Sequence, residues 1–113
     1  MHEYSVVQAL IEQIETIAAQ NQARKVTRII VKIGVMSGIE PHLLEIAFNT
    51  FKEKTICAGA EFVMNIQAVT IQCLDCKKRS ELEPIRYCCP QCESLNIKVI
   101  DGEDLYLMRL EIK

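Results

Sequence analysis

Two pairs of cysteines place the strongest constraint on how this 113-residue chain can fold. The pairs are Cys73-Leu-Asp-Cys76 and Cys89-Pro-Gln-Cys92, and segment 77–88 separates them. A C-x-x-C turn directs two thiolates at one metal ion about 2.3 Å away, and two facing turns complete a tetrahedron. Segment 77–88 has too little apolar material to hold the turns together, so metal binding is expected to supply much of the local folding free energy.

Zinc is the metal that the four thiolates favour. Iron in a rubredoxin-like site uses the same ligands and stays an alternative, but nothing else in the sequence indicates electron transfer. Unbound thiols or disulfides are a further alternative, and disulfides suit an oxidising compartment. A four-thiolate shell leaves no position for water or substrate, so we expect a structural ion rather than a hydrolytic one.

Two further cysteines lie outside these pairs. Cys88 directly precedes Cys89, but Cys89 preserves the two-residue spacing of C-P-Q-C, so Cys89 is the predicted ligand and Cys88 its neighbour. Cys57 lies near the end of the second predicted helix, where a small buried apolar side chain is the expected role.

Composition indicates an ordinary globular chain. Half of the residues are hydrophobic, a quarter are charged and the formal net charge is −2. The one basic run, Lys77-Lys78-Arg79, is interpreted as a solvated loop. The start lacks the features of a secretory signal, and no apolar stretch reaches the roughly 18 to 20 residues that span a bilayer. We therefore expect a cytoplasmic protein that binds neither nucleic acid nor membranes.

Hydrophobic periodicity predicts two helices and several strands. The helices are expected over about 4–20 and from Pro41 to before Gly59, and the strands over about 25–34, 61–71, 95–99 and 106–112. In the strand over 61–71 the apolar phase slips after Ala68, which predicts a bulge or a departure from the sheet. This order predicts an α+β fold, two helices on a mixed three-stranded sheet, with the cysteine module inserted between later strands.

The last strand has a predicted apolar face. Tyr106, Met108, Leu110 and Ile112 alternate with other residues, so we expect them to share one side of the sheet.

The amino terminus, Met1-His2-Glu3, offers a chelating group of nitrogens. The free amine, the deprotonated His2 amide and the His2 imidazole can bind one ion in fused rings, a planar arrangement that suits Ni(II) or Cu(II). The amine and the imidazole must lose their protons, so affinity should fall as pH drops. From these residues alone, a solvated surface histidine is the stronger interpretation.

The whole sequence resembles the HypA family of nickel metallochaperones for hydrogenase and urease maturation. The resemblance is carried by the opening MHEYSVV, by the segment VKIGVMSGIEPHLLEIAFNTF and by the two cysteine pairs. It implies a nickel-binding domain over 1–70 and 101–113 and a zinc-ribbon domain over 71–100. It also implies that Met1, His2 and Glu3 bind the transferred Ni(II), and that Cys73, Cys76, Cys89 and Cys92 bind structural Zn(II).

Two residues near the second helix are further candidate nickel ligands. Glu40 and His42 would serve if their loop folds back over the terminus, and each has a plainer interpretation, Glu40 as a helix-start acid and His42 as a solvated side chain. Family members pass nickel toward the [NiFe]-hydrogenase large subunit, and in some organisms toward urease, with a GTPase called HypB. The resemblance therefore implies these partners, whereas a monomer and a dimer both stay open.

Two other classes of function compete with the metallochaperone. A zinc-ribbon adaptor or nucleic-acid-binding module is the alternative, although the acidic balance and the absence of aromatic residues clustered near the basic run disfavour nucleic acid. An enzyme is disfavoured because no recognisable motif sets a nucleophile beside either of the two histidines.

Overall fold

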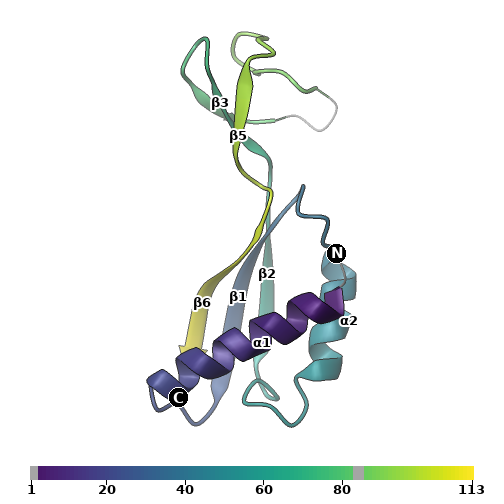
Figure 1. Ribbon diagram of the computed structural model, residues 1–113, viewed down its shortest axis with the longest axis vertical. Coiled ribbons are helices and arrows are strands. Elements are labelled where there is room, and N and C mark those ends of the chain that lie inside the picture. The colour runs from purple at the N-terminus through teal and green to yellow at the C-terminus, as the bar shows by residue number, and fades with distance from the viewer. Residues whose placement is uncertain (1–2, 83–85) are drawn as a thin grey trace.

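The computed structural model describes residues 3–82 and 86–113. The chain forms two three-stranded sheets that follow one another along an elongated molecule of 51 × 26 × 17 Å (Figure 1). Its elements, in chain order, are α1 (Glu3–Gln20), β1 (Val26–Gly34), α2 (Pro41–Phe51), β2 (Glu61–Gln67), β3 (Thr70–Cys73), β4 (Arg79–Glu81), β5 (Ile97–Asp101) and β6 (Leu105–Ile112).

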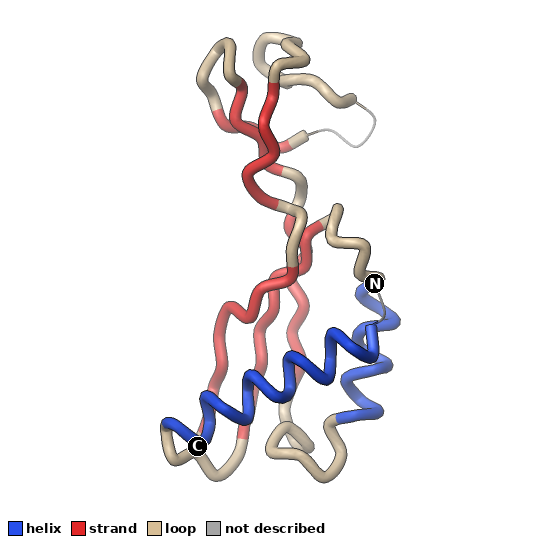
Figure 2. The backbone as a smooth tube through the Cα atoms, viewed as in Figure 1, coloured by secondary structure: helices blue, strands red, loops and turns tan. Residues whose placement is uncertain are grey.

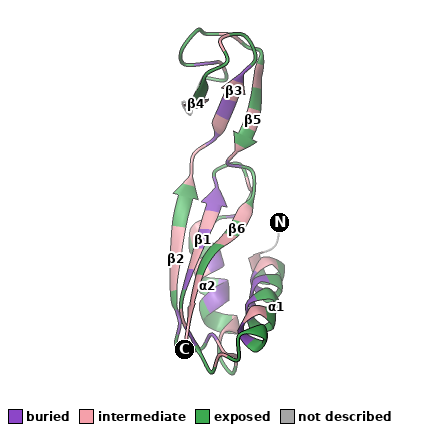
Figure 3. Ribbon diagram, turned by 90° about the vertical axis from the view of Figure 1, so that its left-hand side faces the viewer, coloured by how far each residue is buried: buried purple, intermediate pink, exposed green. Residues whose placement is uncertain are grey.

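The first sheet has the order β2-β1-β6 and is mixed, as predicted. Strand β1 runs parallel to β2 and antiparallel to β6. Figures 1 and 3 show that both helices lie against one face of this sheet and leave the other face uncovered. In the part of the chain that the structure describes, no helix is long and apolar enough to cross a membrane.

The main core lies between the helices and the covered face of the first sheet. Helix α1 buries residues that recur every three or four positions, and β1 buries every second residue from Ile29 to Ile33, as the two periodicities require. The fully or nearly fully buried members of this core are Val7, Leu10, Ile11, Ile14, Val26, Ile29, Val31, Ile33, Ile39, Leu44, Ala47, Phe48, Cys57 and Ala60.

Helix α2 begins where the sequence predicts. Pro41 occupies the first turn, and the Glu40 carboxylate accepts a hydrogen bond of 2.7 Å from the Leu43 N–H. Proline suits this position because its missing N–H would have no partner there, and the carboxylate satisfies one of the remaining donors. The helix ends at Phe51, well before Gly59.

The predicted phase slip after Ala68 is the point at which the chain leaves the first sheet. Strand β2 ends at Gln67, and β3 begins at Thr70 in the second sheet, which Figure 2 shows as a separate group of strands beyond the first sheet. The second sheet has the order β4-β3-β5 with antiparallel pairing. The predicted single strand over 61–71 is therefore two strands that pair with different partners.

The predicted face of the last strand is wrong in its first half. Leu105 and Leu107 pack against the main core, whereas Tyr106 and Met108 are 46% and 55% exposed. The register passes from Ile30–Arg109 to Val31–Leu107 and leaves Met108 unpaired, which is a β-bulge. A bulge shifts the alternation of side chains by one residue. Tyr106 and Met108 therefore point away from the face on which Leu110 and Ile112 pack against the core.

The strand predicted over 95–99 is also displaced. Strand β5 covers Ile97–Asp101, and Leu95 lies outside it and is exposed. Asp101 ends this strand, and the chain bends at 102–104 before β6 begins.

Gly34 lies where β1 meets the turn after β5. A Cβ at this position would lie 2.3 Å from the carbonyl carbon and oxygen of Gly102, which are backbone atoms that have no rotamer by which to move away. Gly102 itself has φ of 101° and packs on the backbone of Val69. The close approach of these three segments therefore requires glycine at both positions.

Replacing Gly34 with alanine should destabilise this junction. We expect Gly34→Ala to lower the free energy of unfolding in urea by about 1–3 kcal/mol, because the backbone must shift to admit the methyl group. Gly59→Ala is the matched control, since nothing lies within 4 Å of a Cβ there. Equal effects of the two substitutions would show that the close approach does not constrain the fold.

Candidate metal centre

Four cysteine sulfurs converge at the far end of the second sheet. Sγ of Cys73 lies 3.6 Å from Sγ of Cys92, Sγ of Cys76 lies 3.7 Å from Sγ of Cys89, and all four lie within 4.8 Å of one another. Ligands at the corners of a tetrahedron with Zn–S bonds of about 2.3 Å would be separated by roughly 3.8 Å. The arrangement thus has the size of a four-thiolate zinc-type site.

The two cysteine turns have the same local structure. In the first, the Cys73 N–H donates to the Lys78 carbonyl, and the Lys77 N–H donates back to the Cys73 carbonyl. In the second, the Cys89 N–H donates to the Ser94 carbonyl, and the Glu93 N–H donates back to the Cys89 carbonyl. Each residue of the second turn lies sixteen positions after its counterpart in the first. Lys77 and Glu93 occupy equivalent places with φ of 68° and 62°. The cluster is therefore built from two equivalent knuckles that face each other.

Backbone N–H groups point at the sulfurs. The Cys76 N–H lies 3.4 Å from Cys73 Sγ, and the Gln91 N–H lies 3.4 Å from Cys89 Sγ. The hydrogen bond from Cys76 is the main reason that the pKa of the Cys73 thiol is lowered to about 6. Such donors stabilise the thiolate, which is the form that binds metal.

The same cluster resists full ionisation when no cation is present. The Ser94 N–H acts to lower the pKa of Cys92, but burial and the neighbouring cysteines outweigh it and raise this pKa to about 12. Four adjacent thiolates repel one another, so a bound dication is what allows all of them to be charged together.

A polar bridge ties the two knuckles together outside the sulfur cluster. The Ser94 hydroxyl donates to the Asp75 carboxylate, and the Asn96 side-chain amide lies 3.5 Å from its other oxygen. The Leu74 N–H also donates to the Asn96 carbonyl at 2.9 Å. The hydrogen bond from Ser94 is the first cause of the lowered pKa of Asp75. This bridge was not predicted from the sequence. The residues that could have indicated it are Asp75, inside the first C-x-x-C, and Ser94, two positions after the second.

The apolar support of this site is small. Among the described residues its buried cluster consists of Val69, Ile71, Cys73 and Cys89, with a few partly buried residues around them. Two of these four members are themselves cysteines of the metal cluster, so little apolar area would hold the second sheet together without an ion.

The structure separates the two remaining cysteines from the site. Among the described residues the cluster includes Cys89 and not Cys88, as predicted from the spacing. Cys57 is fully buried in the main core, and burial raises the pKa of its thiol to about 11. Cys57 therefore remains a neutral thiol at physiological pH, consistent with the predicted packing role.

The structure describes two of the four predicted nickel ligands, Glu3 and Glu40, and the further candidate His42. Met1 and His2 lie outside the described residues. Of the remaining candidates, the Glu3 carboxylate accepts a hydrogen bond of 3.4 Å from the Glu40 N–H, and the Glu40 carboxylate caps α2 through Leu43. The structure thus brings Glu3 and Glu40 together at the start of α1, whereas His42 is exposed on α2.

Comparison with known proteins identifies the family. The family model described as "Hydrogenase/urease nickel incorporation, metallochaperone, hypA" matches residues 1–112. The chain belongs to the HypA family. It is 51% identical to the hydrogenase maturation factor HypA of Aquifex aeolicus, over 100% of this chain and 98% of the relative. It is 54% identical to the corresponding HypA of Shewanella sp. (strain MR-7), over 100% and 96%.

Solved HypA structures have the same fold. The solution structure of the Ni metallochaperone HypA from Helicobacter pylori aligns with a TM-score of 0.74 and 36% identity, over 99% of this chain and 97% of that one. A second solution structure of HypA aligns with a TM-score of 0.77 and 35% identity, over 100% and 97%. The α+β fold predicted from the sequence is confirmed, and so is membership of a family of metallochaperones rather than enzymes.

Proposed function

We propose that this HypA chain binds Ni(II) at its amino terminus and delivers it during maturation of [NiFe]-hydrogenase. The observation that carries the proposal is the full-length family match, which includes the terminal residues. Met1 and His2 would supply the amine, the amide nitrogen and the imidazole, a planar set of nitrogens that suits Ni(II). Glu3 and Glu40 are proposed to support this site, because their hydrogen bond joins the starts of α1 and α2.

Zinc is proposed as the resident metal of the four-cysteine site. Cys73, Cys76, Cys89 and Cys92 would hold it, and the knuckle N–H groups would stabilise their thiolates. We further propose that residues 1–70 and 101–113 act as the nickel-binding domain and 71–100 as the zinc-ribbon domain. The division lies within one residue of the boundary between the sheets, since Thr70 and Asp101 pair with each other as the end residues of β3 and β5 in the second sheet.

The proposed setting is cytoplasmic maturation machinery. A HypB-type GTPase and the hydrogenase large subunit are the proposed partners, with urease maturation proteins in organisms that have urease. The chemistry of the terminus supports transfer of the metal. Protonation of the amine and of the imidazole near neutral pH would release the nickel ion that these nitrogens bind.

Nickel titration of zinc-loaded, untagged protein tests the proposed site. We expect stoichiometric binding by calorimetry in the natural chain, and an affinity at least tenfold lower in His2→Ala and in a variant whose terminal amine is acetylated, because the first loses the imidazole nitrogen of the chelate and the second loses the amine nitrogen. Zinc content and the circular dichroism spectrum should stay unchanged in both variants. Equal nickel binding by all three proteins would place nickel elsewhere and favour the zinc-ribbon adaptor.

A further inference from the structure

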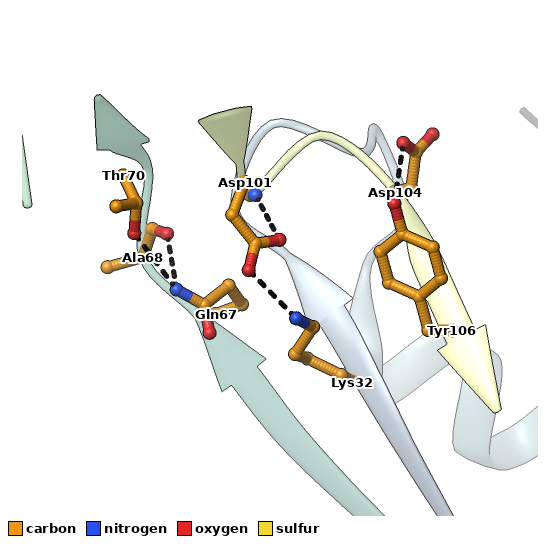
Figure 4. A network of polar contacts seen from close by, with 8 residues as sticks. Lys32, Gln67, Ala68, Thr70, Asp101, Asp104 and Tyr106 are labelled. Carbon is orange, nitrogen blue, oxygen red and sulfur yellow. Dashed lines mark hydrogen bonds and ion pairs between the residues drawn. The ribbon is translucent and has the colours of Figure 1, made fainter. Parts of the chain in front are cut away.

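The two sheets are joined through a narrow crossing of three backbone segments. These are the end of β1 at Gly34, the connection between Gln67 and Thr70, and the turn that begins at Gly102. Figure 4 shows Lys32 of β1 reaching toward Asp101 at the end of β5, with Gln67 bound to Ala68 and Thr70 beside them. Two of these segments, 67–70 and 101–105, are the covalent connections between the sheets within the described residues, so the crossing sets how the sheets are oriented relative to each other.

One ion pair connects the sheets directly. Lys32 Nζ lies 2.8 Å from Asp101 Oδ2, and the side chains are only 23% and 30% exposed. Every other ion pair among the described residues joins groups within the first sheet or within the cysteine region. Lys32 is also held 5.2 Å from the centre of the Tyr106 ring. The Lys32–Asp101 pair therefore acts as a latch between the two sheets.

Backbone hydrogen bonds connect the Lys32–Asp101 latch to the loop after β1. The second oxygen of Asp101 accepts the Gly102 N–H at 2.8 Å, and the Gly102 carbonyl accepts the Met36 N–H at 2.8 Å. The Val35 N–H donates to the Gln67 carbonyl at 2.9 Å. The side chains of Val35 and Met36 are exposed, so these backbone bonds, rather than side-chain packing, fix the start of the loop.

The same loop leads to the proposed nickel site. Ser37 accepts the Ile39 N–H through its hydroxyl oxygen, and Ile39 is buried in the main core. The next residue, Glu40, caps α2 and donates its N–H to Glu3. A pocket of about 210 Å³ lies between Val6 of α1, residues 37–39 and the turn 103–105. The loop is thus held at one end by the backbone bond of Met36 to Gly102 and at the other by Ile39 in the core, and Glu40 follows directly after it.

We propose that Lys32 and Asp101 are positioning residues for nickel binding. They hold the cysteine region in the orientation that lets Gly102 anchor Met36, and this anchor helps to place Glu40 against Glu3. The inference rests on the proposed function, because it assigns the latch a role in nickel binding. A partly buried ion pair contributes modestly to stability, so a partner that moves the cysteine region can open it without unfolding the chain. Opening the latch then loosens the support of the nickel site.

Amide hydrogen exchange in the zinc-loaded full chain tests the latch. Lys32→Gln removes the cation, and Asp101→Asn removes the anion while leaving an oxygen to accept the Gly102 N–H. We expect exchange of the Met36 amide to accelerate about threefold to tenfold in each variant, and no further in the double variant, because both remove one interaction. Lys32→Arg should restore slow exchange. Arg109→Gln is the matched control, since it removes the Arg109–Glu111 pair of the same sheet, away from the crossing.

Nickel titration of the same proteins tests the positioning role. Lys32→Gln and Asp101→Asn should bind nickel several-fold more weakly, with unchanged zinc content and unchanged exchange at Ile29 in the core, and Lys32→Arg should recover the affinity. Unchanged exchange at Met36, additive effects in the double variant, or nickel affinity equal to that of the natural chain would each overturn the proposal. Failure of the natural chain to bind nickel would refute the proposed function, while the exchange data would still decide whether the latch exists.

Discussion

Removal of zinc is expected to unfold the second sheet while the first sheet stays folded. The second sheet has a very small apolar cluster, whereas the main core buries fourteen residues among those described. Zinc binding to small four-ligand motifs contributes an apparent free energy of about 10–16 kcal/mol, far more than this cluster can supply. Nuclear magnetic resonance spectra after chelation should therefore lose the dispersed amide signals of Ile71 and Cys73 and keep those of Ile29 and Val31.

Cysteine substitutions separate a metal effect from a general loss of stability. Cys76→Ser should abolish stoichiometric zinc binding and reproduce the chelated spectrum, because it removes one of four converging sulfurs. Cys88→Ser is the matched control, since Cys88 adjoins a ligand but lies outside the cluster. A second sheet that stays folded after chelation, or equal zinc loss in both variants, would contradict a structural role for the metal.

Local chemistry explains which parts of this fold could be predicted. The cysteine cluster depends on spacing within two short turns, and the start of α2 depends on Glu40 and Pro41, so neighbouring residues in the sequence determine both. The face of β6 was mispredicted in its first half because the bulge at Met108 depends on pairing with Ile30 and Val31 of β1, which lie 79 and 76 positions before their partners in the chain. Alternation within one strand carries no information about an extra residue relative to a distant partner.

The crossing between the sheets shows the same limit. A glycine is readily seen in a sequence, but the need for one at Gly34 arises only because Gly102 packs against it. The pairing of Lys32 with Asp101 likewise joins residues that no local motif connects. The sequence predicted a departure from the sheet near Ala68. It did not predict the contacts of Gly34 with Gly102 and of Lys32 with Asp101, because these join segments that are distant in the chain.

Phe48→Ala should cause the largest loss of stability of any single substitution in the main core. The Phe48 side chain is fully buried and stacks on Phe62 with ring centres 4.3 Å apart and planes within 8° of parallel. Truncating a buried phenylalanine leaves a cavity and typically costs about 3–5 kcal/mol. A domain of this size is stable by only about 5–15 kcal/mol, so the midpoint of urea unfolding should fall markedly.

Two further variants keep this measurement interpretable. Phe48→Leu retains most of the volume and should cost less than about 2 kcal/mol, so it remains measurable if the alanine variant fails to fold. Leu43→Ala, on the same helix but 50% exposed, should change stability by less than about 0.5 kcal/mol. Comparable losses at Leu43 and Phe48 would show that α2 is held by its ends rather than by its buried face. If the buried face dominates, the packing of Phe48 holds α2 against the sheet, and with it the Glu40 cap that contacts Glu3 at the start of α1.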